Sequence, residues 1–254
     1  YLVDPVFADP SSYSSLSLWL ASIGYAIQIY ADFSGYSCMA IGSALMLGFY
    51  LPENFKYPYL ARDFSDFWQR WHITMSRFFR DYVYIGLGGN RCSSKRNTMN
   101  LATTTLISGL WHGAAWTFVL WGGIHGALIA FQRILAGGRL SAFFSSRIFR
   151  QLLFYFFLLM TWITFRSLDI SSAFDYYVGL FSNQSGLSLD WYPWFPLACA
   201  FIILDHGYGY WLEARKTGAL LVGDFLKAVF YVVIIIIAYR YIPQDVSPFI
   251  YFQF

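Results

Sequence analysis

The sequence predicts an all-α protein that crosses a membrane several times, with an amphipathic helix in the membrane interface and an interrupted, re-entrant helix pair. Three observations lead to this prediction. Of the 254 residues, 57% are hydrophobic and only 12% are charged, whereas soluble domains average about 25% charged residues. Long stretches of the chain carry no charge, and one of them is too long for a single crossing. The composition excludes an ordinary soluble globule, and its 26 Phe and 20 Tyr exclude a disordered chain.

The uncharged stretches define the expected membrane segments. They cover residues 10–31, 33–52, 97–132, 151–165, 191–204 and 228–239. A helix needs about 20 mostly apolar residues to cross hydrocarbon about 30 Å thick. The last three stretches reach that length if a flanking charged side chain extends to the interface. We therefore expect four to six membrane segments.

Asp32 separates the first two uncharged stretches. A carboxylate between apolar runs is unfavourable unless it is paired or hydrated. It marks either a helix break at the interface or an internal carboxylate with a structural or site role. Residues 10–52 accordingly form either one kinked helix or two short ones.

Residues 64–82 predict one amphipathic helix. At about 100° per residue, the aromatic side chains fall on one side and most charged side chains on the other. Asp66 with Arg70, and Arg77 with Asp81, are spaced to pair along the charged side. A helix with aromatic and arginine faces is typical of the membrane interface, although a soluble core helix has the same pattern.

Basic residues concentrate around this helix. Residues 53–96 hold eight Lys or Arg and four Asp or Glu. A basic stretch between apolar ones favours a cytoplasmic membrane flank over a nucleic-acid-binding surface. We therefore expect contact with membrane lipid and none with nucleic acid.

The stretch 97–132 predicts a segment that enters the membrane and returns. As a helix, its 36 residues would measure about 54 Å, too long for one crossing and too short for two full ones. Basic residues flank both ends, which places both ends on the cytoplasmic side. The expected break lies at 108–113, where two glycines bracket His112. Because an interrupted helix at membrane depth must pack in protein or line a cavity, we expect His112 to lie deep and beside open space.

The four histidines differ in what their positions allow. An imidazole at membrane depth stays neutral because desolvation disfavours its charged form. A neutral ring at His112 can act as a general base on a hydroxyl, which raises a reaction rate by about 10²–10⁴-fold. The alternative for His112, and also for His72 on the edge of the apolar stripe, is a structural hydrogen bond. His125 would lie about 220° from His112 on a continuous helix, so the two share a face only if the break reorients them. Asp205 and His206 are adjacent and should not face each other on a helix; we expect them to be hydrated at the interface.

Other sequence signals for chemistry are weak. The turn at 86–91, followed by Lys95 and Arg96, could cradle the phosphates of an anionic donor, or it could be a plain turn with Arg91, Lys95 and Arg96 as membrane anchors. The chain lacks the G-x-S-x-G, H-E-x-x-H and G-x-x-x-x-G-K-[ST] motifs. Its three cysteines show no C-x-x-C spacing. We expect no bound metal and no resident cofactor.

Several strings in this order resemble the membrane-bound O-acyltransferase family, and within it the bacterial branch that includes alginate O-acetylases. They are FWQRWHITMS at 67–76, RDYVYI at 80–85, GGNR at 88–91 and GLWHGAAW at 109–116, with QIYADFSGY at 28–36 and FIYFQF at 249–254. The resemblance is strong over residues 1–135 and looser beyond. Gly86 stands where the family pattern leads us to expect Pro.

The resemblance implies a site and a reaction. His112 stands where the family has its catalytic histidine, and His72 where it has its second characteristic histidine. Family likeness implies transfer of an acetyl group from a cytoplasmic donor, acetyl-CoA, towards an exported polysaccharide such as alginate. Arg91, Lys95 and Arg96 would then attract the donor phosphates, and a periplasmic acetyltransferase of the SGNH type would be the partner.

The resemblance also implies a place in the cell and a longer protein. We expect a multi-pass protein of the bacterial inner membrane, with residues 1–254 forming one membrane domain that is the C-terminal part of the whole. Two other functions remain open. One is D-alanyl transfer to teichoic acid within the same family, and the other is a non-catalytic export or channel subunit.

Overall fold

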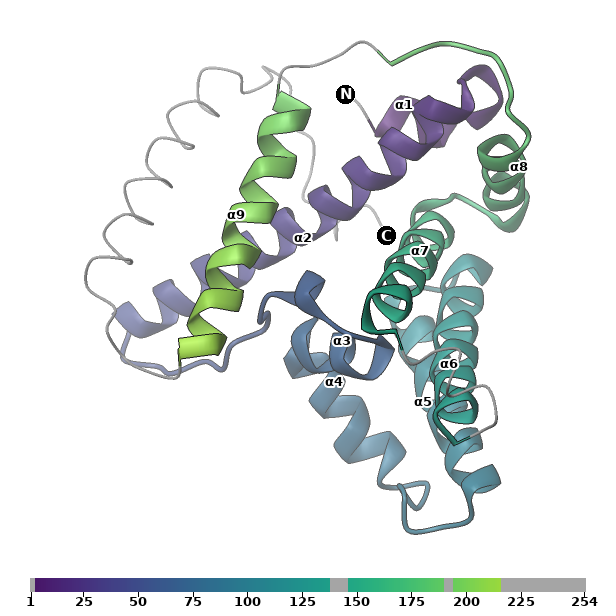
Figure 1. The fold of residues 1–254 in the computed structure, drawn as a ribbon. Helices are drawn as coiled ribbons and strands as arrows, with labels where there is room; N and C mark the ends of the chain where they lie inside the picture. Colours follow the sequence, from purple (N-terminus) through teal and green to yellow (C-terminus); the bar gives the residue numbers. More distant parts are fainter. Residues whose placement is uncertain (1–2, 138–145, 190–193, 216–254) are drawn as a thin grey trace. The chain divides into compact units, whose positions relative to one another are not determined.

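The computed structural model describes residues 3–137, 146–189 and 194–215, and in these ranges the regular secondary structure is helical (Figure 1). An isolated bridge joins Tyr13 to Leu187. The all-α prediction is therefore confirmed for the described part of the chain. The uncharged stretch at 228–239 lies outside the described residues.

The helices follow one another along the chain with short connections. Their bounds are α1 (Asp4–Ala8), η1 (Pro10–Ser12), α2 (Ser15–Met46), η2 (Pro58–Leu60), α3 (Phe64–Arg70), α4 (Ile73–Phe78), the π-helical η3 (Phe79–Tyr84), α5 (Ser94–His112), α6 (Trp116–Gly137), α7 (Arg147–Arg166), α8 (Ile170–Phe181) and α9 (Trp194–Arg215). The chain divides into two compact units at residues 1–206 and 207–254. All contacts discussed below lie within the first unit.

Serine and aspartate side chains begin several of these helices. A side-chain oxygen at the N-cap accepts a hydrogen bond from a backbone N–H that has no partner within the helix. Asp63 accepts from the Asp66 amide at 2.9 Å, and Asp169 from the Ser172 amide at 2.7 Å. Ser14, Ser93 and Ser146 cap α2, α5 and α7 in the same way.

Residues 15–46 form the single continuous helix α2. Asp32 is half-buried inside it, so the interpretation of Asp32 as a helix break is wrong. The alternative of two short helices is wrong for the same reason. An aspartate within a helix disturbs the backbone little, because its side chain can remain partly solvated while the helical hydrogen bonds continue.

The predicted helix over 64–82 is broken. The chain forms α3, then an extended Trp71 and a left-handed His72 (φ 43°), then α4 and η3. The break is held by backbone hydrogen bonds to the preceding loop, from Lys56 N to Arg70 O and from Ile73 N to Asn54 O, both 2.9 Å. A helical wheel cannot register such bonds, because they come from outside the segment.

Of the two charged pairs predicted on this segment, the structure forms the first, while Asp81 pairs with a different arginine. Arg70 Nε donates to Asp66 Oδ1 at 2.8 Å, as predicted. Asp81 instead accepts from its neighbour Arg80 at 2.7 Å, because the π-helical turn of η3 changes the spacing along that face.

Helices α5 and α6 form the predicted hairpin. Helix α5 ends at His112, and α6 begins at Trp116 and packs along α5 (Figure 1). Glycines allow the two backbones to approach closely. A Cβ at Gly109 would lie 2.2 Å from the Phe118 carbonyl oxygen, and one at Gly122 would lie 2.3 Å from that of Thr105. The interruption is present, but it falls at 113–115, because residues 108–112 still belong to α5.

Helix α7 forms the centre of the aromatic core. Its buried face carries Phe154, Leu158, Trp162 and Phe165, which pack against α3 and α6. At the C-terminal end of α7, Arg166 Nη2 donates to Asp4 Oδ1 at 2.8 Å and connects this helix to α1.

One stretch of the described residues, Ile148–Arg166 in α7, is long and apolar enough to cross a membrane. Four to six such segments were expected from the uncharged stretches. Lack of charge is a weaker criterion than high hydropathy, since α5 is uncharged after Arg96 but rich in Thr, Ser and Asn. The number of crossings therefore stays a prediction.

Candidate functional site

His112 lies at the tip of the α5–α6 hairpin. It is the last residue of α5, and Gly113 follows it in an extended conformation. A Cβ at Gly113 would lie 2.7 Å from the Phe118 ring, so a residue without a side chain suits the point where the chain reverses. The turn thus fixes the direction in which the His112 imidazole leaves the helix.

The His112 ring lies among aromatic side chains and is only partly covered. Its centroid lies 5.0 Å from that of Trp111, 5.2 Å from Trp121 and 5.1 Å from Phe165. The His112 side chain is half-buried, and the side chain of Trp111 beside it is 57% exposed. Aromatic walls restrict water around an imidazole and still leave it approachable from its open side.

His72 is held at the break between α3 and α4 by Asn54. The distance from His72 Nδ1 to Asn54 Oδ1 is 3.2 Å. The same oxygen accepts from Thr74 N at 3.3 Å and from Thr74 Oγ1 at 2.8 Å, and the Asn54 amide nitrogen donates to Ser37 Oγ at 3.1 Å. Because Asn54 Oδ1 can only accept, His72 Nδ1 must donate, which in the neutral ring leaves Nε2 as the acceptor.

The structure brings His72 near His112 at the tip of the hairpin and places His125 further along α6. The His72 ring packs against Trp111 at 6.1 Å, and Trp111 in turn packs against His112. The antiparallel return of α6 places His125 and His112 against the same indole, that of Trp121, at 4.7 and 5.2 Å. The break between α5 and α6 therefore reorients the chain so that His112 and His125 contact the same side chain, which a continuous helix would not allow.

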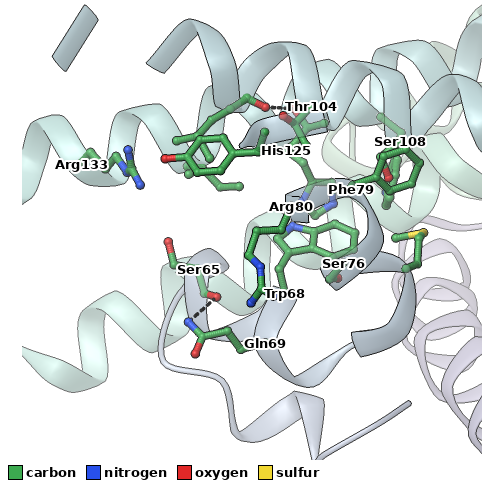
Figure 2. Close-up of a pocket in the computed structure, with 16 residues that line it drawn as sticks. Ser65, Trp68, Gln69, Ser76, Phe79, Arg80, Thr104, Ser108, His125 and Arg133 are labelled. Atoms are coloured by element: carbon green, nitrogen blue, oxygen red, sulfur yellow. Dashed lines mark hydrogen bonds between the residues drawn. The ribbon is translucent and has the colours of Figure 1, made fainter. Parts of the chain in front are cut away.

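His125 is a candidate site residue whose role the sequence left unassigned. Its side chain is fully buried, with 0% exposure, and lies among Phe64, Trp68 and Trp121. It also lines a cavity of about 330 Å³ between α3, α4 and η3 on one side and α5 and α6 on the other (Figure 2). We call this the His125 cavity. Sequence spacing could not reveal the placement, because it depends on where α5 ends.

His112 and His72 do not line the His125 cavity. Its wall consists of Ser65, Trp68, Gln69, Met75, Ser76, Phe79, Arg80, Tyr84, Leu101, Thr104, Thr105, Ser108, Trp121, His125, Ile129 and Arg133. His112 is half-buried, and the expectation that it lies deep in the membrane beside open space stays a prediction. The indole of Trp121 contacts both the His112 ring and the His125 ring.

The basic residues Arg91, Lys95 and Arg96 lie away from the His125 cavity wall. All three are exposed, in the turn before α5 and in its first helical turn. The turn begins with Gly88 (φ 108°) and Gly89 (φ 54°), both in the left-handed region that favours glycine. Asn100 donates to the Gly89 carbonyl at 3.1 Å and anchors this turn to α5. The role of the three cations in binding phosphate stays a prediction.

His206 is buried, and Asp205 is half-buried and accepts a hydrogen bond from the Tyr30 hydroxyl at 3.2 Å, so the expected hydration of this pair at the interface is wrong. His206 packs among the rings of Tyr30, Tyr57 and Tyr59, with centroid distances of 5.2, 6.0 and 5.4 Å. Its Nδ1 lies 3.0 Å from the Ile202 carbonyl oxygen and 3.6 Å from Asp205 Oδ2. Aromatic residues of α2 and the following loop cover this part of α9, which its own sequence could not indicate.

Comparison with known proteins gives the site a family context. The model of the membrane-bound O-acyltransferase family matches residues 7–173. The chain is 44% identical over 186 residues to the probable alginate O-acetylase AlgI of Azotobacter vinelandii, covering 71% of this chain and 36% of that protein. It is 40% identical over 190 residues to the peptidoglycan O-acetyltransferase of Helicobacter pylori, covering 74% and 36%.

A more distant relative carries a different acyl group. The chain is 37% identical over 109 residues to the teichoic acid D-alanyltransferase of Streptococcus thermophilus, covering 40% of this chain and 26% of that protein. In each of these comparisons the match spans about a third or less of the relative's length.

Proposed function

Because the chain belongs to the membrane-bound O-acyltransferase family, we propose that it transfers an acetyl group to an acceptor hydroxyl on the way to an exported polysaccharide, with His112 as the general base. The observation that carries this proposal is the position of His112 at the hairpin tip, partly open and walled by Trp111, Trp121 and Phe165. A neutral imidazole there accepts the proton of the acceptor hydroxyl as that oxygen attacks the acyl carbonyl. The bond between the acyl carbon and the sulfur of the thioester donor then breaks, the acyl group stays on the hydroxyl oxygen, and the imidazolium gives its proton to the leaving sulfur.

We assign His72 to positioning. Its Nδ1–H is committed to Asn54, so its Nε2 is the atom that can accept a hydrogen bond from the acceptor or the donor. The left-handed backbone at His72 and the Asn54 contacts to Thr74 fix the ring relative to α4. A fixed ring orients a substrate without the entropic loss of ordering a mobile one.

The donor in this proposal is cytoplasmic acetyl-CoA. Arg91, Lys95 and Arg96 would attract its phosphates from their exposed turn. We place the protein in the bacterial inner membrane as a multi-pass protein, and a periplasmic SGNH-type acetyltransferase would take the acetyl group onward. The greater coverage of the acetyl-transferring relatives favours acetyl over D-alanyl as the acyl group.

The proposal is tested by His112→Gln in the full-length protein, expressed at wild-type abundance in its own cells. Loss of a general base lowers the rate by about 10²–10⁴-fold, so polymer acetylation should fall to background. His206→Gln is the matched control, since it removes another buried imidazole that lies among Tyr30, Tyr57 and Tyr59. Acetylation by that variant should stay near the wild-type level.

The labelled product distinguishes the remaining functions. Transfer of radiolabel from acetyl-CoA to polymer supports the proposal, whereas transfer of D-alanine to teichoic acid would replace it with the other family reaction. If labelled acetyl groups are not transferred at all while polymer is exported, the chain acts as an export or channel subunit. Wild-type acetylation by His112→Gln would remove His112 from the mechanism.

A further inference from the structure

Helix α2 presents one face to the loop that holds His72. Phe33 and Ser37 lie one helical turn apart on that face, and both side chains are buried. The Phe33 and His72 rings meet at an interplanar angle of 90°, with a centroid distance of 4.6 Å. Ser37 Oγ accepts from Asn54 Nδ2 at 3.1 Å. The helix therefore contacts His72 both directly and through Asn54, and the proposed function gives these contacts no role.

The hydrogen bonds fix which way the Asn54 amide faces. The backbone N–H of Thr74 can only donate, and it lies 3.3 Å from Asn54 Oδ1. Exchanging the two ends of the amide would bring an NH₂ group against this donor. The NH₂ group consequently faces Ser37, whose hydroxyl oxygen accepts from it. Every polar atom of the amide has a suitable partner in this orientation, and the exchanged orientation leaves the Thr74 N–H without one.

The orientation of Asn54 in turn fixes the tautomer of His72. Because Asn54 Oδ1 only accepts and lies 3.2 Å from His72 Nδ1, the proton of the neutral ring is on Nδ1, and Nε2 carries a lone pair. Within the described residues, Nε2 makes no hydrogen bond and is not among the fully buried polar atoms that lack a partner. It therefore keeps some accessible surface. The same ring packs against Trp111, which is 57% exposed.

We infer that Ser37 and Thr74 are positioning residues, which act through Asn54 to keep His72 Nε2 as a hydrogen-bond acceptor for substrate. The inference rests on the acyl transfer proposed above and specifies the group that His72 binds. A lone pair binds a hydroxyl or an amide N–H and repels a carbonyl oxygen. His72 therefore does not stabilise the negative charge that develops on the acyl oxygen during transfer.

The reacting hydroxyl is not the group that His72 binds. That hydroxyl has a single proton, which goes to His112 in the proposed reaction. The partner of His72 Nε2 is therefore a second donor group, either another hydroxyl of the acceptor molecule or an amide N–H of the acyl donor. Both offer the same N–H or O–H chemistry, and the Michaelis constant for acetyl-CoA distinguishes them.

The tautomer is measured by solid-state NMR of the full-length protein in lipid bilayers, with ¹³C- and ¹⁵N-labelled histidine and no substrate. Protonated and unprotonated ring nitrogens differ in ¹⁵N shift, and correlations to Cγ and Cδ2 distinguish Nδ1 from Nε2. The His72 signals are those missing from His72→Gln. In the wild type we expect the proton on Nδ1.

Ser37→Ala removes the acceptor at one end of the amide, and Thr74→Val removes the hydroxyl that donates to the other end at 2.8 Å. Each should shift the ratio of His72 tautomers by about 3- to 10-fold towards the form with the proton on Nε2, the effect of about one hydrogen bond. Two variants at opposite ends of Asn54 should therefore change the same signal in the same direction.

Acyl transfer in membranes gives the second measurement. Ser37→Ala and Thr74→Val should lower kcat by about 3- to 10-fold, and Ser37→Thr and Thr74→Ser, which keep the hydroxyls, should restore it. An unchanged KM for acetyl-CoA assigns the group at His72 to the acceptor, whereas a rise in that KM assigns it to the acyl donor.

Ser34→Ala provides the matched control. Ser34 lies on α2 as well, but its hydroxyl donates within its own helix, to the Ala31 carbonyl at 3.4 Å. This variant should match the wild type in tautomer ratio and in rate.

Three results would overturn the inference. The wild-type proton could be found on Nε2, the tautomer ratio could stay unchanged in Ser37→Ala and Thr74→Val, or the rate could fall while the ratio stays unchanged, which would mean that both residues support the fold alone. Because the NMR measurement needs no substrate, its result is independent of the reaction. Failure of the wild type to transfer acetyl groups would instead overturn the proposed function.

Discussion

Asn54 determines which nitrogen of His72 is free. Its side-chain oxygen accepts from Thr74 and therefore also accepts from His72 Nδ1. Few features of the sequence around Asn54 point to this role, since an Asn in a loop after Pro52 and Glu53 is typical of a turn. The contact depends on the loop returning to the break in the 64–82 segment, so only the folded chain shows it.

We predict that Asn54→Ala lowers acyl transfer by about 10- to 100-fold, since a misplacement of about 1 Å can cost about 10²-fold. Asn54→Asp keeps an oxygen acceptor for His72 and Thr74 and should recover most of the activity. The measurement is transfer of labelled acetyl groups in membranes, normalised to protein abundance. Equal loss in both variants would show that Asn54 supports the fold and not the orientation of His72.

Glycines determine how closely helices α5 and α6 pack in their hairpin. Gly109, Gly122 and Gly126 stand where a Cβ would overlap the partner helix, at 2.2 Å from Phe118 O, 2.3 Å from Thr105 O and 2.6 Å from Thr105 Oγ1. Small residues at such contacts let helices associate through backbone packing, which is common in membrane proteins. The close approach at these glycines brings α5 and α6 together, so that His112 and His125 both contact Trp121.

We predict opposite effects for the two adjacent glycines of α6. Gly122→Ala places a Cβ against the Thr105 backbone and should destabilise the protein by about 1–3 kcal/mol, as expected of overpacking. Gly123→Ala meets only Leu106 Cδ2 at an ordinary 3.5 Å, and higher helix propensity should stabilise it by up to about 1 kcal/mol. Thermal unfolding in detergent measures both. Similar midpoints for the two variants would contradict close packing at Gly122.

Two glycines of helix α2, Gly35 and Gly42, have open space around them. A Cβ at Gly35 or Gly42 would meet nothing within 4 Å. Replacing either with Ala should therefore stabilise the protein by about 0.5–1 kcal/mol through backbone entropy alone. The same thermal unfolding assay should show a higher midpoint for each variant. A lower midpoint would mean that these positions contact a partner or another part of the full-length protein.

At the scale of the whole molecule, the orientation of the chain in the membrane follows from its basic residues. Arg91 precedes α5, Lys95 and Arg96 lie in its first turn, and all three are exposed. Because Lys and Arg concentrate in cytoplasmic loops, we predict that this turn lies on the cytoplasmic side and the hairpin tip at His112 towards the opposite side. Cys92 lies exposed in the same turn, so the natural protein carries a reporter of this orientation.

We predict that a membrane-impermeant maleimide labels Cys92 only in inside-out vesicles, after Cys38 and Cys199 have been replaced by Ser. Ala114→Cys, at the tip of the hairpin, should not react from the cytoplasmic side when Cys92 is also replaced. Labelling of Cys92 in intact cells or right-side-out vesicles would reverse the topology. Total thiol in detergent-solubilised protein provides the reference for complete reaction.

By itself, the sequence determined the helical class, the family resemblance and the presence of an interruption beside His112. These follow from local properties, because charge depletion, helical periodicity and glycines around His112 act within a few residues. Tertiary structure alone decided the break at His72, the continuity of α2 past Asp32, the burial of His206 and the place of His125. Each of these depends on contacts between residues far apart in the chain, such as Asn54 with His72 or Tyr59 with His206. Hydrogen bonding and burial of side chains far apart in the chain outweigh the local preference of a segment for helix or for solvent, and only the packed chain specifies these contacts.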